Sequence, residues 1–449
     1  MGGGLAGMLA AHVLAGFADR VTVVERDRLP KDEEPRPGVP QGRHPHVLLQ
    51  GGQTALEALL PGFLAELTAA GAPRVGMPSD LVLWQNGRWF RRLPATTHIY
   101  TGSRAQLEGL VRQRVLRGHS IDTVESTDVV GLLGDARRVR GVAVRERSGT
   151  TSRGKEEILD ADLVVDASGA GTRAARWLAG IGARPPHEET IDTGLAYASR
   201  VYRGPEGVLG DGTAGYYVYP NPEQVHAGGA LPLEDGSHLV IVSGLRGDEP
   251  PTTEAEFEAY VNRLPHPLLH RWLERAEPLS SPFGFRRTGN IRRRYDLAGA
   301  APAGFLATGD ALCTFNPIYG QGMAVAAMNA LALRDCLADR RRTPSTRRVQ
   351  RALLAASRQA WDISAGADRA MPGATGNAVT GAPADRVADW YLARVQERAP
   401  GDPVVGRAFR AVLTLAEPVG ALFAPPVARA VLFTPPAPTP TTPPPNPEP

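Results

Sequence analysis

An acidic residue followed by closely spaced glycines is the first feature of this chain with a recognisable chemistry. Asp310 follows a short apolar run that reads as a strand, and Pro317, Gly320 and Gly322 come after it. A carboxylate at a strand end can accept hydrogen bonds from sugar hydroxyls. The glycines let a flat ring approach the backbone, and the helix that begins near Met323 would turn its amides and positive dipole end toward negative charge. An ordinary strand-to-helix turn is the alternative.

A second glycine motif opens the chain. Gly2, Gly4 and Gly7 form a GxGxxG pattern, an Ala- and Leu-rich helix follows, and Glu25 ends the apolar strand 21–24. The glycine pattern alone is weak, because many turns contain it. With the strand and its terminal acid it predicts a dinucleotide-binding unit, in which the acid binds a ribose hydroxyl.

These motifs together resemble a known family. The two glycine motifs, Arg104 at the start of a helix and the Asp-Ala-Ser-Gly run at 166–169 are similar to the group A FAD-dependent monooxygenases of the para-hydroxybenzoate hydroxylase type. Residues 38–46 and 315–320 resemble more narrowly the flavin epoxidases of polyether ionophore biosynthesis. The resemblance extends to about residue 340.

The resemblance implies an α/β fold with a Rossmann-like FAD-binding domain of the GR2 type, an antiparallel substrate-binding sheet and a C-terminal helical segment. The implied division is 1–76, 101–190 and 290–341 for FAD, 77–100 and 191–289 for substrate, 342–433 for the helices, and a disordered proline-rich tail at 434–449. In the family an apolar strand precedes the first glycine. Met1 stands where it should end, so we expect that strand to be missing through a start assigned too late or a truncation.

The resemblance also assigns site residues. Those expected to bind FAD are Gly2, Gly4, Gly7, Glu25, Arg104, Val129, Asp310, Pro317, Gly320, Gly322 and Met323. Those expected to line the active site are Gln41, Arg43, His46, Pro317 and Tyr319, from two loops beside the flavin. Val129 matches a position whose backbone meets adenine. A cation in the first turn of a helix is disfavoured by the dipole, so Arg104 indicates an anionic neighbour, which the family identifies as the pyrophosphate.

The implied reaction needs no catalytic protein residue, because the cofactor carries the chemistry. In the family, non-covalently bound reduced FAD and O2 form a C4a-hydroperoxide, with electrons from NAD(P)H or a separate flavin reductase. We expect it to epoxidise alkenes of a polyketide or similar apolar substrate. An aromatic hydroxylase with a Tyr or His relay is the first alternative, and a flavin-binding protein without turnover is the second. Flavin halogenases carry a Trp-x-Trp-x-Ile-Pro sequence that this chain lacks.

The middle of the chain predicts the substrate-binding sheet. Residues 191–289 alternate apolar and polar side chains, which is typical of antiparallel strands with one face solvated or lining a cavity. Candidate lining residues are Tyr197, Tyr217, Tyr219, Phe283 and Phe285. Packing in the core is the alternative for each of them.

Composition excludes several other classes of function. The 449 residues carry a formal net charge of only +3, and the arginines are scattered, so we expect no nucleic-acid partner. Cys313 and Cys336 are the only cysteines, too few for a disulfide framework or a Cys-rich metal site, and we expect no metal. No apolar run of about 18 residues occurs, so we expect no stable membrane association. A reducing cytoplasm fits these features.

The polar, proline-rich residues 31–46 predict a loop rather than a packed element. In the family this loop passes beside the flavin, so Arg36, Gln41, Arg43, His44 and His46 are candidates for contact with flavin or substrate, and a solvated loop is the alternative.

Overall fold

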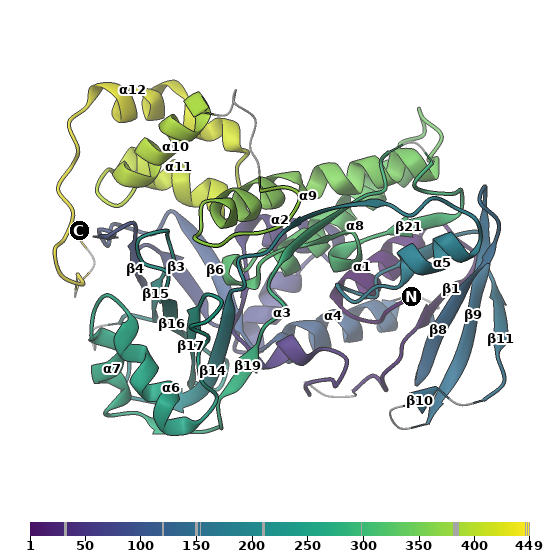
Figure 1. The fold of residues 1–449 in the computed structure, drawn as a ribbon, viewed down its shortest axis with the longest axis horizontal. Coiled ribbons are helices and arrows are strands. Elements are labelled where there is room, and N and C mark those ends of the chain that lie inside the picture. The colour runs from purple at the N-terminus through teal and green to yellow at the C-terminus, as the bar shows by residue number, and fades with distance from the viewer. Residues whose placement is uncertain are drawn as a thin grey trace.

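The computed structural model describes residues 1–30, 34–118, 121–148, 151–152, 154–208, 212–297, 299–379, 386–444, 446 and 448. Figure 1 shows an α/β part around the N-terminus, an antiparallel sheet beside it, and a group of C-terminal helices above that sheet. This arrangement confirms the predicted fold class.

Two short parallel strand pairs form the centre of the α/β part. One pair joins β1 (Val21–Val24) to β7 (Ile121–Val124), and the other joins β12 (Val164–Asp166) to β21 (Phe305–Ala307). All three residues of β21 are buried, as expected for a parallel strand covered on both faces.

The first two residues lie between these pairs. The Gly2 amide donates to the Val24 carbonyl at 2.8 Å, and the amino group of Met1 donates to the Val165 carbonyl at 2.8 Å. The Met1 carbonyl accepts from the Ala167 amide at 2.9 Å. The glycine turn is thereby fixed to both strand pairs.

Helix α8 (Gly322–Ala338) lies among three other helices of this part. It packs against α1 (Leu5–Leu14), α2 (Gln50–Leu59) and α9 (Thr346–Arg369). Its Ala-rich sequence has small side chains on every side, which lets three helices approach it closely. The remaining elements here are α3 (Phe63–Ala69), α4 (Arg104–Gly118), α5 (Ala174–Gly180), β8 (Thr127–Gly134), β9 (Val139–Ser148), β10 (Thr151–Ser152) and β11 (Glu157–Asp160).

The sheet that the sequence predicts to bind substrate, called the substrate sheet below, has eight strands, drawn from two separate segments of the chain. Its order is β18-β14-β17-β16-β15-β4-β5, and β19 pairs with β14. The strands are β4 (Leu81–Gln85), β5 (Arg88–Trp89), β14 (Ala196–Arg203), β15 (Gly215–Val218), β16 (Ala227–Pro232), β17 (His238–Gly244), β18 (Glu277–Pro278) and β19 (Phe283–Phe285).

The two faces of this sheet have different neighbours. Val240 and Val242 pack with side chains of α6 (Glu254–Tyr260) and α7 (Leu268–Leu273) in a separate apolar cluster. The residue between them, Ile241, points to the opposite face and lines a cavity. The period of two along the strands therefore sorts residues between a packed face and a cavity face, as the sequence predicts.

Two smaller sheets and several single turns of 3-10 helix connect the larger parts. One sheet is β2-β6-β3 and the other is β13-β20-β22. Their bounds are β2 (His46–Leu48), β3 (Arg74–Met77), β6 (Thr97–Gly102), β13 (His187–Ile191), β20 (Asn290–Arg294) and β22 (Cys313–Thr314); the 3-10 turns are η1 (Pro40–Arg43), η2 (Val261–Arg263), η3 (Gly309–Ala311), η4 (Pro317–Tyr319) and η6 (Val419–Phe423).

The C-terminal region comprises α9, α10 (Arg386–Arg398), α11 (Pro403–Leu413) and α12 (Pro425–Phe433), followed by a proline-rich tail. The tail has no helix or strand among its described residues. Its composition predicts disorder, yet Glu448 forms an ion pair with Arg91.

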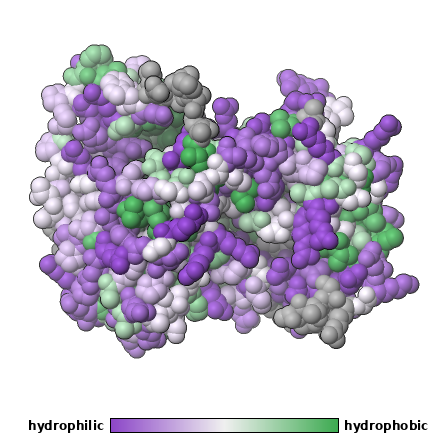
Figure 2. All heavy atoms as spheres, in the orientation of Figure 1, coloured by the Kyte–Doolittle hydropathy of each residue, from purple (hydrophilic) through white to green (hydrophobic). Residues whose placement is uncertain are grey.

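On the face shown in Figure 2, apolar residues are interspersed with polar ones. Within the described part of the chain, no helix has the length and apolar character needed to cross a bilayer.

The apolar cluster behind the substrate sheet provides a test of the fold. Trp272 of α7 is fully buried there, whereas Trp390 of α10 is 51% exposed. We expect Trp272→Ala to lower the free energy of unfolding by about 3–5 kcal/mol, because it leaves a large cavity. Trp390→Ala should change it by less than about 1 kcal/mol. Equal effects of the two variants in urea unfolding would contradict this packing.

Candidate functional site

The N-terminal glycines form a tight turn that admits no larger side chain at two positions. Gly2 has a φ of +97°, and a Cβ there would lie 2.5 Å from the Ala167 carbonyl oxygen. A Cβ on Gly7 would lie 1.8 Å from the Gly2 carbonyl oxygen. Helix α1 therefore begins directly against the turn, with Gly4 at its N-cap and no side chain capping its amides.

Glu25 lies at the end of β1, next to this turn. Its carboxylate accepts from the Gly3 amide at 2.5 Å and from the Asp27 amide at 2.9 Å. The Nη1 atom of Arg36 is 3.3 Å away. A carboxylate has about four acceptor positions, so these contacts leave capacity for a further hydroxyl donor.

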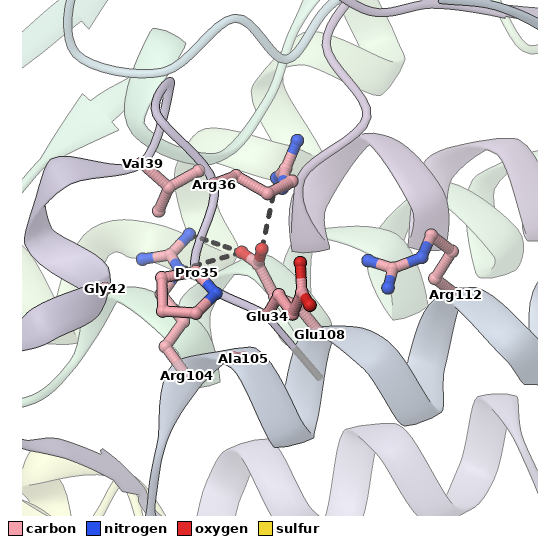
Figure 3. Close-up of a pocket in the computed structure, with 9 residues that line it drawn as sticks. All are labelled: Glu34, Pro35, Arg36, Val39, Gly42, Arg104, Ala105, Glu108 and Arg112. Atoms are coloured by element: carbon pink, nitrogen blue, oxygen red, sulfur yellow. Dashed lines mark hydrogen bonds and ion pairs between the residues drawn. The ribbon is translucent and has the colours of Figure 1, made fainter. Parts of the chain in front are cut away.

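A small charged pocket adjoins Glu25, at the start of α4. Figure 3 shows Arg36 and Arg104 directed at the carboxylate of Glu108 from two sides. Arg36 Nη2 is 3.1 Å from Glu108 Oε2, and Arg104 Nε donates to Oε1 at 2.8 Å. Arg112 and Glu34 also line the pocket, whose volume is about 270 Å³. Three guanidinium groups against two carboxylates give it a net positive charge.

Burial and neighbouring charges shift the pKa of Glu108 in opposite directions. Burial would raise the pKa of Glu108, but Arg104 and Arg36 together lower it to about 2. Arg36 is only 6% exposed, and its Nε has no partner among the described residues. The sequence predicted a loop here, with Arg36 and His44 as candidates for ligand contact and a solvated loop as the alternative. Residues 31–33 lie outside the described ones, and Arg36 and His44 are buried because they contact other elements.

Asp310 and Asp166, at the ends of paired strands, have different surroundings. Both carboxylate oxygens of Asp166 accept hydrogen bonds, from Ser168 and from Thr172, so this residue fixes its own turn. The Asp310 carboxylate accepts none from the described residues. Burial raises its pKa, and Arg104 and Arg293 oppose that rise. Asp310 is therefore the acceptor available to a ligand.

The start of α8 lies beside Asp310. A Cβ on Gly322 would be 3.8 Å from Asp310 Oδ1. Gly320 is left-handed, with a φ of +65°, and a Cβ there would lie 2.3 Å from Val47 Cγ2. No side chain caps α8, so the first amides, from Gly322 and Met323, have no intrahelical acceptor. The carboxamide oxygen of Gln321 is buried without a partner in the described part of the chain.

A large cavity extends from this loop between the substrate sheet and the C-terminal helices. Its volume is about 1050 Å³, including the part open to solvent. Most of its lining is aliphatic or aromatic. The lining residues are His44, Pro45, Val47, Leu49, Met77, Leu81, Leu83, Gln85, Phe90, Ile99, Tyr197, Tyr217, Tyr219, Leu231, Ile241, Pro317, Ile318, Tyr319, Gly320, Gln321, Ile363, Phe409, Arg410, Leu413 and Thr414.

The structure brings together only some of the predicted active-site residues. Pro317 and Tyr319 line the cavity, whereas Gln41, Arg43 and His46 do not. Arg43 lies over the ring of Phe283 at 4.9 Å.

His46 lies on β2, where its Nδ1 is 2.8 Å from the His44 carbonyl oxygen. Burial and Arg104 lower the pKa of His46 to about 3. Its neighbours Pro45 and Val47 line the cavity, and His46 points away from it, because successive residues of an extended segment point to opposite sides. His44, which precedes the strand, also lines the cavity.

The aromatic residues predicted to line the cavity fall into two groups. Tyr197, Tyr217 and Tyr219 line the cavity, as the sequence predicts. Phe283 and Phe285 do not, although Phe285 stacks on Tyr197 with ring centroids 5.3 Å apart. Val129 is partly buried on β8, where the pairing with β9 shifts in register before Gly131.

Sequence reasoning missed the residues that the C-terminal helices contribute. Asp368 of α9 is 2% exposed and accepts from Tyr319 Oη at 2.8 Å and from Asn290 Nδ2 at 2.6 Å. It also accepts from Asn316 Nδ2 at 2.9 Å. Arg410 of α11 lines the cavity. Neither lies in a local motif, so only the amphipathic pattern of its helix could have indicated that it faces inward.

The residues present fit FAD. The glycine turn and Glu25 suit an adenosine ribose, the positive pocket suits a diphosphate, and Asp310 and the α8 N-terminus suit the ribityl chain and ring. Cys313 is fully buried, and burial raises the pKa of its thiol, which makes covalent attachment through it unfavourable. No group of metal-ligating side chains occurs among the described residues.

Comparisons with known proteins agree with this fit. A family model described as an FAD binding domain matches residues 1–363. The chain is 34% identical to protein Rv3254 of Mycobacterium tuberculosis over 342 residues, which covers 75% of this chain and 72% of that protein.

Two solved structures share the fold. The flavin-dependent brominase Bmp2 superimposes with a TM-score of 0.65 at 17% identity, covering 92% of both chains. PqsL from Pseudomonas aeruginosa, a probable FAD-dependent monooxygenase, gives a TM-score of 0.56 at 18% identity, covering 82% of this chain and 92% of that chain.

The contrast between the two aspartates predicts different effects of their replacement. Asp310→Ala should weaken FAD binding about ten- to a hundredfold, because a charged acceptor for a hydroxyl is lost. Asp166→Ala should lower the melting temperature, through loss of the turn contacts, with a much smaller effect on FAD affinity. Flavin titration of the two apoproteins measures this difference, and equal losses of affinity would refute it.

The buried charge network predicts a pH dependence of stability. The pKa of Glu108 is about 2 in the folded protein against an ordinary 4.5, so its contribution is complete above about 4.5 and is lost as the pH falls toward 2. Near neutral pH, Glu108→Gln should lower the free energy of unfolding by about 2–3 kcal/mol. The difference in the free energy of unfolding between Glu108→Gln and the wild type should shrink as the pH falls toward 2.

The control for this measurement is Glu66→Gln, which removes a half-exposed ion pair with Arg114 and should cost at most about 1 kcal/mol. A Glu108→Gln deficit that stays constant from neutral pH to strongly acidic pH would show that the carboxylate charge is not its source.

Proposed function

The chain belongs to the FAD-binding domain family, and from this premise we propose that it is an FAD-dependent monooxygenase that epoxidises an alkene of an apolar, polyketide-like substrate. The observation that carries the proposal is the junction of two sites. The 317–321 segment lines the large apolar cavity and leads directly into the N-terminus of α8 beside Asp310.

The division of roles follows from this junction. FAD, when bound, would supply the activation of O2 and an electrophilic oxygen atom. Glu25, Arg104 and Asp310 would hold its ribose, diphosphate and ribityl groups. The unpaired amides of Gly322 and Met323 would stabilise negative charge on the ring system.

The cavity residues would position the substrate and exclude water. Pro317 has no amide hydrogen, and Gly320 has no side chain, so the loop presents an even, mostly apolar surface at the point where the cavity and cofactor site meet. An alkene needs no deprotonation before it accepts oxygen, so epoxidation requires no acid or base from this lining. The aliphatic side chains of Leu81, Leu83 and Ile241 suit a hydrocarbon chain.

The source of electrons is part of the proposal. A GxGxxG pattern also occurs at Gly210, Gly212 and Gly215, but Gly215 begins the strand β15 and no helix follows it, so this pattern does not predict a second dinucleotide site. NAD(P)H would therefore bind transiently, or a separate flavin reductase would deliver the electrons. Oxidation of NADH and NADPH by the purified protein, with and without an added reductase, separates these two routes.

Aromatic hydroxylation is a second candidate, favoured by one contact. The Tyr319 hydroxyl donates to buried Asp368, and burial raises the pKa of that carboxyl, which makes it a stronger base than usual. The oxygen of Tyr319 could then accept a proton from a substrate phenol while its own proton moves to Asp368.

Product analysis under labelled oxygen tests the main proposal. With reductant, FAD and an apolar polyene, we expect a product that gains one oxygen atom from ¹⁸O2 and opens to a diol in acid. Production of hydrogen peroxide alone would instead support a flavin-binding protein without substrate turnover. A phenolic product from an aromatic substrate would support the second candidate.

Removal of one hydroxyl distinguishes the two reactions. If the enzyme epoxidises alkenes, Tyr319→Phe should change turnover by less than about tenfold, because no proton leaves the substrate. For a phenol, loss of the relay should reduce turnover about 10²–10⁴-fold. Tyr219→Phe, a cavity tyrosine with no contact to Asp368 among the described residues, is the matched control. Comparable effects of the two variants would exclude a relay through Tyr319.

A further inference from the structure

Arg410 is a buried cation in the wall of the substrate cavity. It lies on α11 and is only 3% exposed, yet it is one of the residues that line the cavity. Taking a guanidinium group out of water is unfavourable unless an anion or several acceptors replace the water. The contacts of Arg410 should therefore show what compensates its charge.

The protein supplies little compensation. Arg410 Nε and Nη2 both donate to one neutral hydroxyl, Thr96 Oγ1, at 3.3 and 3.1 Å. Among the described residues no carboxylate lies within ion-pair distance of it. Burial alone lowers the pKa of Arg410, to about 10, without an opposing acidic neighbour. The guanidinium is still protonated at neutral pH, so its charge is retained.

The Nη1 atom has no hydrogen-bond acceptor among the described residues. Gly406 precedes Arg410 by one helical turn, and a Cβ at that position would lie 3.0 Å from Nη1. The glycine therefore lets Nη1 lie close against the helix backbone. Because Arg410 lines the cavity and the described residues leave its guanidinium group with an unused donor, a cavity ligand can supply the missing acceptor.

The rest of the described cavity lining is neutral. His44 is the only other basic residue in it, and burial and Arg43 lower its pKa to about 4. Burial raises the pKa values of Tyr197, Tyr217 and Tyr219, so these phenols stay protonated. One positive charge in a neutral, mostly apolar cavity selects for a single negative charge on an apolar molecule.

We infer that Arg410 is the anchor for an anionic group of the substrate, a carboxylate or a similar oxyanion attached to an apolar chain or ring. This inference rests on the proposed function for the cavity's role and deepens it by naming the substrate class. The natural substrate is amphiphilic, with its charged end held by α11 and its apolar body along the substrate sheet.

Binding measurements with a matched pair of probes test the inference on the FAD-loaded protein. The probes are a medium-chain terminal alkenoic acid and the alkenol of the same length, titrated calorimetrically near neutral pH. We expect wild type to bind the acid at least about tenfold more tightly than the alcohol, because only the acid forms charge-assisted hydrogen bonds. Arg410→Met should weaken binding of the acid about ten- to a hundredfold and change that of the alcohol by less than about threefold.

The matched control is Arg407→Met, which removes an exposed arginine from the same helix and should leave both affinities unchanged. Arg410→Lys keeps the charge and should retain part of the preference for the acid. FAD content and melting temperature establish that each variant is folded. The comparison of the two probes on wild type needs no variant, so it stands even where Arg410→Met does not fold.

A wild-type protein that does not prefer the acid, whether it binds both probes equally or neither, overturns the inference. Equal weakening of acid and alcohol by Arg410→Met also overturns it, because Arg410 would then only shape the cavity. The proposed function has a separate test. If the wild-type protein prefers the acid but transfers no oxygen, the monooxygenase is contradicted and the anion site is retained. Oxygen transfer to the alkenoic acid that is unaffected by Arg410→Met contradicts the anion site and leaves the monooxygenase.

Discussion

The buried carboxylate of Asp368 holds the loop on which both functional sites depend. It accepts hydrogen bonds from Asn316 and Tyr319, on either side of Pro317, and from Asn290 on β20. A carboxylate that is 2% exposed is tolerated only when donors replace its water, and these three side chains do so. Helix α9 thereby fixes the 316–320 segment, which lines the cavity and leads into the start of α8.

The structure contains two different environments. In the charged pocket at the start of α4, guanidinium and carboxylate groups are close together, and their pairing keeps Glu108 ionised despite its burial. In the large cavity, the described lining is neutral except for Arg410. A mostly apolar cavity strengthens the interaction of its one charge with a ligand, because no neighbouring charge of the lining opposes it. The first environment therefore suits a phosphate-containing cofactor, and the second suits an apolar ligand with one charge.

The substrate sheet gives the cavity its rigidity. Its far face packs on α6 and α7 through fully buried residues such as Trp272 and Phe257, so the strands cannot shift without opening that cluster. Its near face leaves Tyr217 and Ile241 on the cavity. Helix α11 forms part of the other wall, and its start is capped by Asp402, which accepts from the amides of Val404 and Val405. Residues from both ends of the chain thus line one cavity.

The sequence by itself determined the features that depend on local backbone conformation. The glycine turn before α1, the acid at the end of β1, the turn at Gly320 and the alternation along the substrate strands are all readable from short-range patterns, because each rests on neighbours within a few residues. The tertiary structure alone decided which residues meet across long separations. Arg36 and Glu108 are 72 residues apart, and Tyr319 and Asp368 are 49 apart. Burial changes what such side chains do: for His44, which the sequence left open between ligand contact and solvent, the fold decides on the cavity wall, and Arg410, in a helix without a motif, becomes the only charge described there. No local pattern records burial of this kind, since it arises only when distant segments exclude water together.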